Sequence, residues 1–152
     1  FAFDLDYRAG TGIERMRVGT PPVLQLTALE AALVVWDGVE MADVREASIG
    51  LTDLFITEVD KRCPELTLFS PREGAKRGSQ VSFAHDNAFA VMQALIARDV
   101  IGDFRAPNLI RFGFTPLYID ESDVMGAVEI LADVLDNRIW DDPKYKTKGR
   151  VT

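Results

Sequence analysis

The sequence predicts a two-layer α+β fold, with about four short strands and helices packed on one face of the sheet. Two stretches, residues 41–62 and 122–137, carry apolar residues at the i, i+3, i+4 spacing of amphipathic helices. Short apolar runs between turn-forming residues, such as LIRFGF at residues 109–114, are typical of strands. The 152 residues suffice for one two-layer core but are few for an entire cofactor-dependent enzyme.

Composition excludes several classes of partner. The formal net charge of −7 argues against broad nucleic-acid binding, which needs a basic surface. Every apolar run is far shorter than the roughly 20 residues of a membrane span, and no signal-like segment opens the chain. The single cysteine, Cys63, cannot form an internal disulfide, which fits a reducing compartment. We therefore expect no nucleic acid, no membrane and a cytoplasmic location.

The first part of the chain predicts an arm followed by a long helix. Residues 1–18 lack a helical period and are expected to be irregular, with a short extended piece at residues 16–18. Thr20 is placed to be the N-cap of the helix, with Pro21 at its first position. From residue 23 to residue 36 the helix is apolar on nearly every side, so we expect it to be buried in a core or a subunit interface.

Helices and strands alternate along the rest of the chain. The predicted helices span residues 41–62, 86–98, with Asp86 as N-cap, and 122–137, capped by Asp120 or Ser122. The predicted strands span residues 66–69, 80–84, 100–105 and 109–115. The last two strands form a hairpin across residues 106–108. Beyond residue 137 the chain lacks periodicity and is expected to be partly disordered.

Arg111 is the main candidate for binding a ligand. It interrupts an apolar strand, so its charge needs a partner that the neighbouring sequence does not supply. Strand alternation places Ile110, Phe112 and Phe114 on the core face, and Arg111 on the other face beside Gly113, which leaves room for a ligand. A guanidinium held there suits a carboxylate or a phosphate. The alternative, favoured by spacing alone, is a structural salt bridge to one of the 24 acidic residues or an arginine in solvent.

Other candidate residues have ordinary structural explanations. Arg72, Lys76 and Arg77, in the polar loop at residues 70–78, could contact an anion, but a solvated loop is the more ordinary outcome. His85, the only histidine, follows a strand and is more typical of a structural residue than of a general base. With one histidine and one cysteine, no zinc site of usual composition is expected.

Several segments together resemble one enzyme family. The stretch DVIGDFRAPNLIRFGFTPLY, residues 99–118, resembles the C-terminal signature of bacterial kynureninases, with Asp99 where the signature begins with glycine. The segments FAFDLDYR (1–8), GTPPVLQLTALE (19–30) and RGSQVSFAH (77–85) resemble further family segments in the same order. The resemblance covers the chain from residue 1 to about residue 136. Kynureninases use pyridoxal 5'-phosphate to hydrolyse L-kynurenine to anthranilate and L-alanine in tryptophan catabolism.

This resemblance implies a fold and two site residues. The fold is the small C-terminal domain of a fold-type-I pyridoxal-phosphate enzyme, which acts as a homodimer. Arg111 matches the family arginine that binds the substrate α-carboxylate. Thr20, in GTPP, matches a position that contacts the cofactor phosphate across the dimer interface. Pro21 and Pro22 lack amide hydrogens, so the contact would rest on the Thr20 hydroxyl, and a plain N-cap is the alternative for Thr20.

The resemblance also implies a division of the chain. Residues 1–38 form an arm and a long apolar helix that join a missing large cofactor domain, residues 39–137 form the small domain, and residues 138–152 form a flexible tail. The chain begins with Phe1, inside a family segment, so we expect a fragment. The lysines do not stand in the motif of the cofactor-binding lysine: Lys61, Lys76, Lys144, Lys146 and Lys148. The isolated chain is therefore expected to be inactive, with no catalytic residue and no metal ligand of its own.

Two other functions remain open. The chain could belong to another class-V-like pyridoxal-phosphate enzyme, a cysteine desulfurase or an aminotransferase, and activity with kynurenine or cysteine would separate these. It could also be a non-catalytic domain that dimerises through the helix at residues 23–36. The preference between kynurenine and 3-hydroxykynurenine is open as well.

Overall fold

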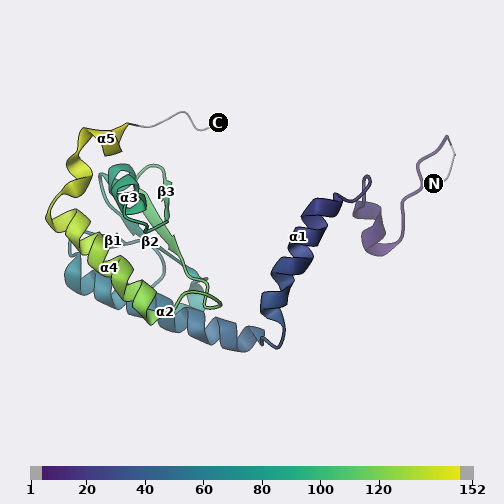
Figure 1. Ribbon diagram of the computed structural model, residues 1–152, viewed down its shortest axis with the longest axis horizontal. Helices are drawn as coiled ribbons and strands as arrows, with labels where there is room; N and C mark the ends of the chain where they lie inside the picture. Colours follow the sequence, from purple (N-terminus) through teal and green to yellow (C-terminus); the bar gives the residue numbers. More distant parts are fainter. Residues whose placement is uncertain (1–4, 148–152) are drawn as a thin grey trace. The chain divides into compact units, whose positions relative to one another are not determined.

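The computed structural model describes residues 5–147 (Figure 1). It divides into two compact units, residues 1–39 and residues 40–152. Every buried apolar side chain among the described residues belongs to the second unit. Half of the FAFDLDYR segment, residues 1–4, lies outside the described residues.

The first unit contains the predicted apolar helix, which begins later than expected. A 3₁₀ turn, η1 (Gly12–Met16), includes the first residue of the expected extended piece at residues 16–18, and α1 (Val23–Leu33) continues into the 3₁₀ turn η2 (Val34–Trp36). The N-cap of α1 is Pro22, and no side chain caps the helix. The assignment of Thr20 as N-cap is therefore wrong. Because a residue that precedes proline is biased towards extended backbone, the Pro21-Pro22 pair delays the helix.

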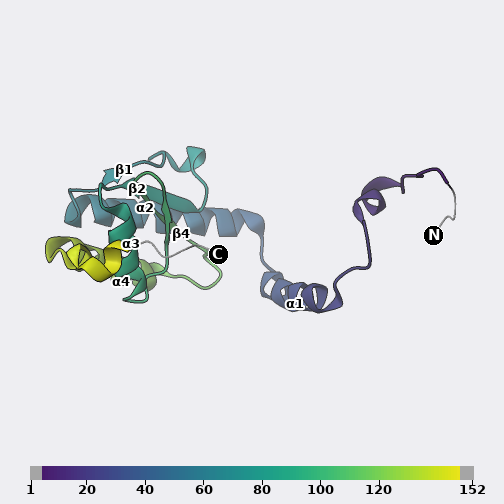
Figure 2. The same cartoon turned by 90° about the horizontal axis from the view of Figure 1, so that it is seen from above.

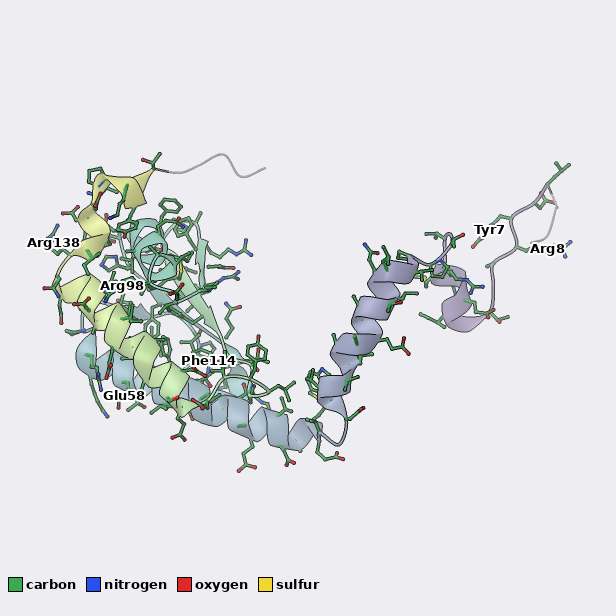
Figure 3. All side chains as sticks on the ribbon, in the orientation of Figure 1. Tyr7, Arg8, Glu58, Arg98, Phe114 and Arg138 are labelled. Atoms are coloured by element: carbon green, nitrogen blue, oxygen red, sulfur yellow. The ribbon has the colours of Figure 1, made fainter. Side chains whose placement is uncertain are left out.

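The apolar side chains of α1 are exposed on every side. Leu24 is 87% exposed, and Leu29 and Leu33 are about half exposed. Figure 3 shows side chains projecting all around this helix. The first unit by itself therefore does not bury α1, and burial in a core or a subunit interface stays a prediction.

The second unit is built on two long helices. The predicted helix at residues 41–62 is confirmed as α2 (Met41–Arg62), and the last long helix is α4 (Glu121–Asp136). The Asp120 side chain caps α4 by accepting hydrogen bonds from the backbone N–H groups of Ser122 and Asp123. The two helices lie side by side, as Figures 1 and 2 show. The residues of α4 that were predicted to face the core are all buried: Val124, Val128, Leu131 and Leu135.

A four-stranded antiparallel sheet packs against these helices, with strand order β1-β2-β4-β3. Its strands are β1 (Thr67–Leu68), β2 (Gln80–Ala84), β3 (Asp103–Arg105) and β4 (Leu109–Gly113). The α+β class, the strand at residues 80–84 and the hairpin across residues 106–108 are confirmed. The other strands are shorter than predicted.

The intervening helix α3 (Ala88–Ile96) also begins later than predicted. Its N-cap position is Asn87, without a side-chain hydrogen bond, and Asp86 lies in the preceding turn. The assignment of Asp86 as N-cap is therefore wrong. The His85 carbonyl accepts from the backbone N–H of Ala88 at 3.0 Å, which closes that turn and sets the later start.

Aromatic rings join the sheet to α2. The ring of Phe55, on α2, has its centroid 4.9 Å from that of Phe112 and 5.1 Å from that of Phe114. Phe83 of β2 contacts the same ring edge-on at 6.0 Å. Ile110, on the same sheet face, is fully buried. The core face predicted for residues 110, 112 and 114 is thus confirmed.

The core extends beyond residue 137, which corrects the expectation of a flexible tail for residues 138–147. Short helices form there, η4 (Ile139–Asp141) and α5 (Pro143–Lys146). Trp140 is buried and its ring contacts His85. A large aromatic side chain buries enough apolar surface to hold a short segment that lacks helical periodicity. Residues 148–152 lie outside the described residues.

Candidate functional site

The sheet face opposite the helices carries a row of polar side chains. The strand register places Ser82 of β2, Arg111 of β4 and Asp103 of β3 directly beside one another. Gln80 and Gly113 form the next row. The Arg111 side chain is 25% exposed, unlike the buried core residues on either side of it in sequence. The predicted orientation of Arg111 is therefore confirmed.

Arg111 forms a two-point ion pair with Asp103. Its Nε donates to Oδ1 of Asp103 at 2.6 Å, and its Nη2 donates to Oδ2. Residues that face each other on antiparallel strands hold their side chains within reach of one another, so the β-hairpin itself builds this pair. The prediction that the neighbouring sequence supplies no partner is wrong, and the salt bridge weighed as an alternative is present.

The pair stays ionised, with a second cation close by. The hydrogen bond from Arg111 is the largest cause that holds the pKa of Asp103 below its usual value, and the same bond raises the pKa of Arg111. Nη2 of Arg105, on the same strand as Asp103, lies 3.7 Å from Oδ2 of Asp103. One carboxylate therefore lies between two guanidinium groups, which leaves a net positive charge on this part of the sheet.

The ion pair does not use all the donors of Arg111. Asp103 takes the Nε hydrogen and one hydrogen of Nη2, which is the side edge of the guanidinium. No acceptor among residues 5–147 is bound to Nη1. One hydrogen of Nη1 and the remaining hydrogen of Nη2 form the end edge of the guanidinium. That end edge matches the spacing of two carboxylate oxygens. Arg111 can therefore bind a second carboxylate without releasing the first.

Glycines shape the space around Arg111. A Cβ built on Gly113 would have nothing within 4 Å, so the face beside Arg111 is open. Gly113 also lines a cavity of about 540 Å³ with the apolar residues Ile101, Phe114 and Tyr118, but Arg111 is not among the residues that line it. By contrast, a Cβ on Gly102 would stand 2.5 Å from the Arg111 carbonyl oxygen. Gly102 thus permits the close approach that holds the Arg111 backbone.

The basic loop at residues 70–78 does not present its arginines to a ligand. Arg77 is buried and donates to the carbonyls of Pro71 and Arg72, to Thr52 Oγ1 and to Asp53. It fastens the loop, which includes the 3₁₀ turn η3 (Gly74–Lys76), to α2. Arg72 and Lys76 are also paired, with Asp60 and Glu73 respectively, each at 2.7 Å. These contacts favour a structural role for the three basic residues over binding of an anion.

His85 and Cys63 also occupy structural positions. Nδ1 of His85 accepts from the backbone N–H of Asn87 at 3.0 Å, and burial is the main cause that lowers the pKa of His85. Burial raises the pKa of the Cys63 thiol to about 12, so the thiol is neutral and unreactive. Within residues 5–147, no group of three or more potential ligands could hold a metal ion. In the same range, no helix is long and apolar enough to cross a membrane.

Thr20 belongs to the first unit, whereas Arg111 belongs to the second. It is exposed and lies just before α1. Within the described part of the chain its hydroxyl makes no hydrogen bond, so it is free to donate. A lone hydroxyl followed by two prolines is too little for a complete phosphate site, which draws on several amide or cationic donors. This unit fits a supporting contact to a phosphate rather than a whole cofactor site.

The described lysines are all engaged in ion pairs on the surface. Lys61 pairs with Glu58, Lys76 with Glu73, Lys144 with Asp142 and Lys146 with Asp141. Lys148 lies outside the described residues. None of these four lysines has the buried setting in which an amine loses its proton and becomes a nucleophile.

Comparison with known proteins gives one consistent result. Residues 44–131 match the family profile described as "Kynureninase C-terminal domain". The chain is 47% identical over 154 aligned residues to kynureninase from Pseudomonas fluorescens. It is 44% identical to the kynureninases of Burkholderia mallei (strain SAVP1) and Burkholderia pseudomallei (strain K96243). Each alignment covers 100% of this chain and 37% of the relative, so the chain spans a little over a third of the length of these relatives.

Proposed function

The chain belongs to the kynureninase family, and from this we propose that it is the C-terminal part of an enzyme that hydrolyses L-kynurenine to anthranilate and L-alanine. The enzyme cleaves a carbon–carbon bond with pyridoxal 5'-phosphate as cofactor, as a cytoplasmic homodimer. The identity of 44–47% to kynureninases along the whole chain supports this family over cysteine desulfurases and aminotransferases. The same identity makes the alternative of a non-catalytic dimerisation domain less favoured.

Arg111 binds the α-carboxylate of the substrate in this proposal. The free end edge of its guanidinium, on an open face next to Gly113, is the observation that carries the assignment. Because the side chain projects from a paired strand, the carboxylate is held in a fixed place, and the bond to be broken is oriented with it. When bound, the cofactor supplies the electron sink for that step. Arg111 contributes binding and orientation, and transfers no proton.

Thr20 contributes a hydrogen bond to the cofactor phosphate from the neighbouring subunit. Its exposed hydroxyl, which is free within the described part of the chain, supports the contact. The covalent attachment of the cofactor and the general acid and base belong to the remaining part of the enzyme. The ion-paired surface lysines support this division of labour. The 152-residue chain alone is therefore inactive.

The experiment is steady-state kinetics of the full-length enzyme with Arg111→Ala. Hydrogen bonds to a charged group are worth about 1.5–3 kcal/mol, so kcat/KM for kynurenine falls about 10- to 100-fold, with KM strongly raised and kcat lowered. Arg72→Ala is the matched control, because Arg72 is a cation that is 61% exposed and pairs with Asp60, away from this sheet face. Near-normal kinetics of Arg111→Ala would exclude the assignment. Activity with cysteine in place of kynurenine would exclude the proposed reaction.

A further inference from the structure

Asp103 contacts Arg111 at two points, which is more than a cross-strand ion pair in a hairpin requires. It meets Arg111 with both carboxylate oxygens, along the side edge formed by Nε and Nη2. A two-point contact fixes the plane of the guanidinium as well as its position, because both N–H bonds must remain directed at their acceptors. The end edge therefore points in one direction only.

The strand neighbours of Arg111 do not restrain its guanidinium in this way. Ser82, on the other side of Arg111, accepts from Nε2 of Gln80 at 3.3 Å and makes no hydrogen bond to the arginine within the described range. Gly113 has no side chain to restrict the arginine. Among residues 5–147, Asp103 is thus the hydrogen-bonding partner that orients Arg111.

We propose that Asp103 is a positioning residue for substrate, which holds Arg111 so that its Nη1–Nη2 edge faces the α-carboxylate. This inference rests on the proposed function of Arg111. An arginine side chain has several rotatable bonds, and a free one would lose that freedom on binding the substrate. Asp103 restricts the Arg111 side chain already when the protein folds. Substrate binding therefore costs less conformational entropy.

Asp103 also has an effect that opposes substrate binding. Its negative charge lies close to the place where the substrate carboxylate binds, and like charges repel. Arg105, 3.7 Å from Asp103, offsets part of that charge. If repulsion outweighed positioning, removal of the Asp103 charge would tighten substrate binding. The two effects therefore predict opposite changes in KM.

The test is Asp103→Asn in the full-length enzyme, because asparagine keeps the shape of the side chain but loses the charge and one acceptor. We expect KM for kynurenine to rise about tenfold, with kcat changed less than about twofold, the loss that corresponds to freeing one long side chain. Asp103→Glu, which retains the carboxylate, should restore part of the affinity. A lowered or unchanged KM in Asp103→Asn would overturn the proposal.

A second measurement separates positioning from general damage to the fold. The decarboxylated amine of kynurenine keeps the aryl ketone but lacks the α-carboxylate, so its inhibition constant should not change in Asp103→Asn. An equal loss for the amine and the amino acid would overturn the proposal. Asp133→Asn is the matched control: Asp133 pairs with Arg98 and is 41% exposed, against 48% for Asp103, but lies on α4. It should leave both constants unchanged.

The same two ligands distinguish failure of this inference from failure of the proposed function. If Arg111→Ala does not weaken kynurenine binding relative to the amine, Arg111 does not bind the carboxylate, and the proposed site is wrong. If Arg111→Ala abolishes that selectivity but Asp103→Asn leaves it intact, the site is right and only the positioning role of Asp103 is wrong.

Discussion

Gly102 and Arg111 approach so closely that no larger residue fits at position 102. A Cβ there would stand 2.5 Å from the carbonyl oxygen of Arg111 and 2.6 Å from Cε of Met92. The methionine end is flexible, but the carbonyl belongs to a strand paired on both sides. The requirement for glycine therefore comes from the backbone of β4.

Gly102→Ala should lower the stability of the chain and displace Arg111. Overpacking of this kind costs about 1–3 kcal/mol in the free energy of unfolding, measured by urea denaturation. Gly50→Ala is the control, since a Cβ there meets nothing within 4 Å and Gly50 lies inside α2. It should raise stability by about 0.5–1 kcal/mol. Equal stability of the two variants would contradict the packing argument.

The ion pair of Arg111 could have been predicted from the sequence. Once the hairpin is placed across residues 106–108, Arg105 faces Leu109, and Asp103 then faces Arg111 two residues further along. The pairing register of the predicted hairpin was therefore the signal for this ion pair. Asp99 stands where the family signature has glycine, and this glycine was a signal for a left-handed backbone conformation. The φ of Asp99 is 65°, a conformation that favours glycine.

Other features depend on contacts that local patterns do not carry. Arg77 is buried because Thr52, 25 residues earlier, and the loop carbonyls accept its hydrogens. Trp140 is held by tertiary contacts in a segment without periodicity. Thr20 does not cap α1 because Pro22 biases the preceding Pro21 towards extended backbone, which delays the helix. Periodicity predicted α2 and α4 because their stability comes from one continuous apolar face.

Replacement of Arg77 should be the most damaging change in the loop at residues 70–78. Arg77→Ala removes the guanidinium of a residue that is 5% exposed and leaves the Pro71 and Arg72 carbonyls without their donor. We expect the free energy of unfolding to fall by about 3 kcal/mol in urea denaturation.

Arg72→Ala is the comparison for Arg77, because it is a cation of the same loop that pairs with Asp60 in solvent, with 61% of its side chain exposed. Exposed pairs contribute little to stability, so this variant should resemble the unchanged chain. Similar losses in both variants would show that charge, rather than the buried contacts, holds the loop.

His85 should make the chain less stable as the solution becomes mildly acidic. Its pKa in the folded state is lowered, first by burial, so the unfolded state, with an ordinary value of about 6.5, binds the proton more readily. The contribution of neutral His85 to stability is therefore fully present above about pH 6.5. It is lost as the pH falls through the lower pKa of His85 in the folded state. His85 is the only histidine, so one imidazole NMR signal reports the titration.

The control for this titration is His85→Gln, which should remove the dependence of stability on pH just below 6.5. Paired carboxylates such as Asp133, whose pKa is lowered chiefly by its hydrogen bond from Arg98, titrate in a more acidic range and do not interfere. An imidazole that titrates at or above 6.5 in the folded chain would contradict the burial argument.

A chain that begins at Glu40 should fold without the first unit. The division into units falls between Val39 and Glu40, and the buried apolar side chains of the described residues all follow it. Urea denaturation followed by the fluorescence of the buried Trp140 should give the same midpoint with and without residues 1–39.

The whole chain should self-associate as its concentration rises, because α1 exposes leucines on every side. Sedimentation would show the shortened chain as a monomer, and Leu24→Glu should weaken association of the whole chain without shifting the midpoint. Unfolding of the shortened chain would show instead that α1 contributes to the core.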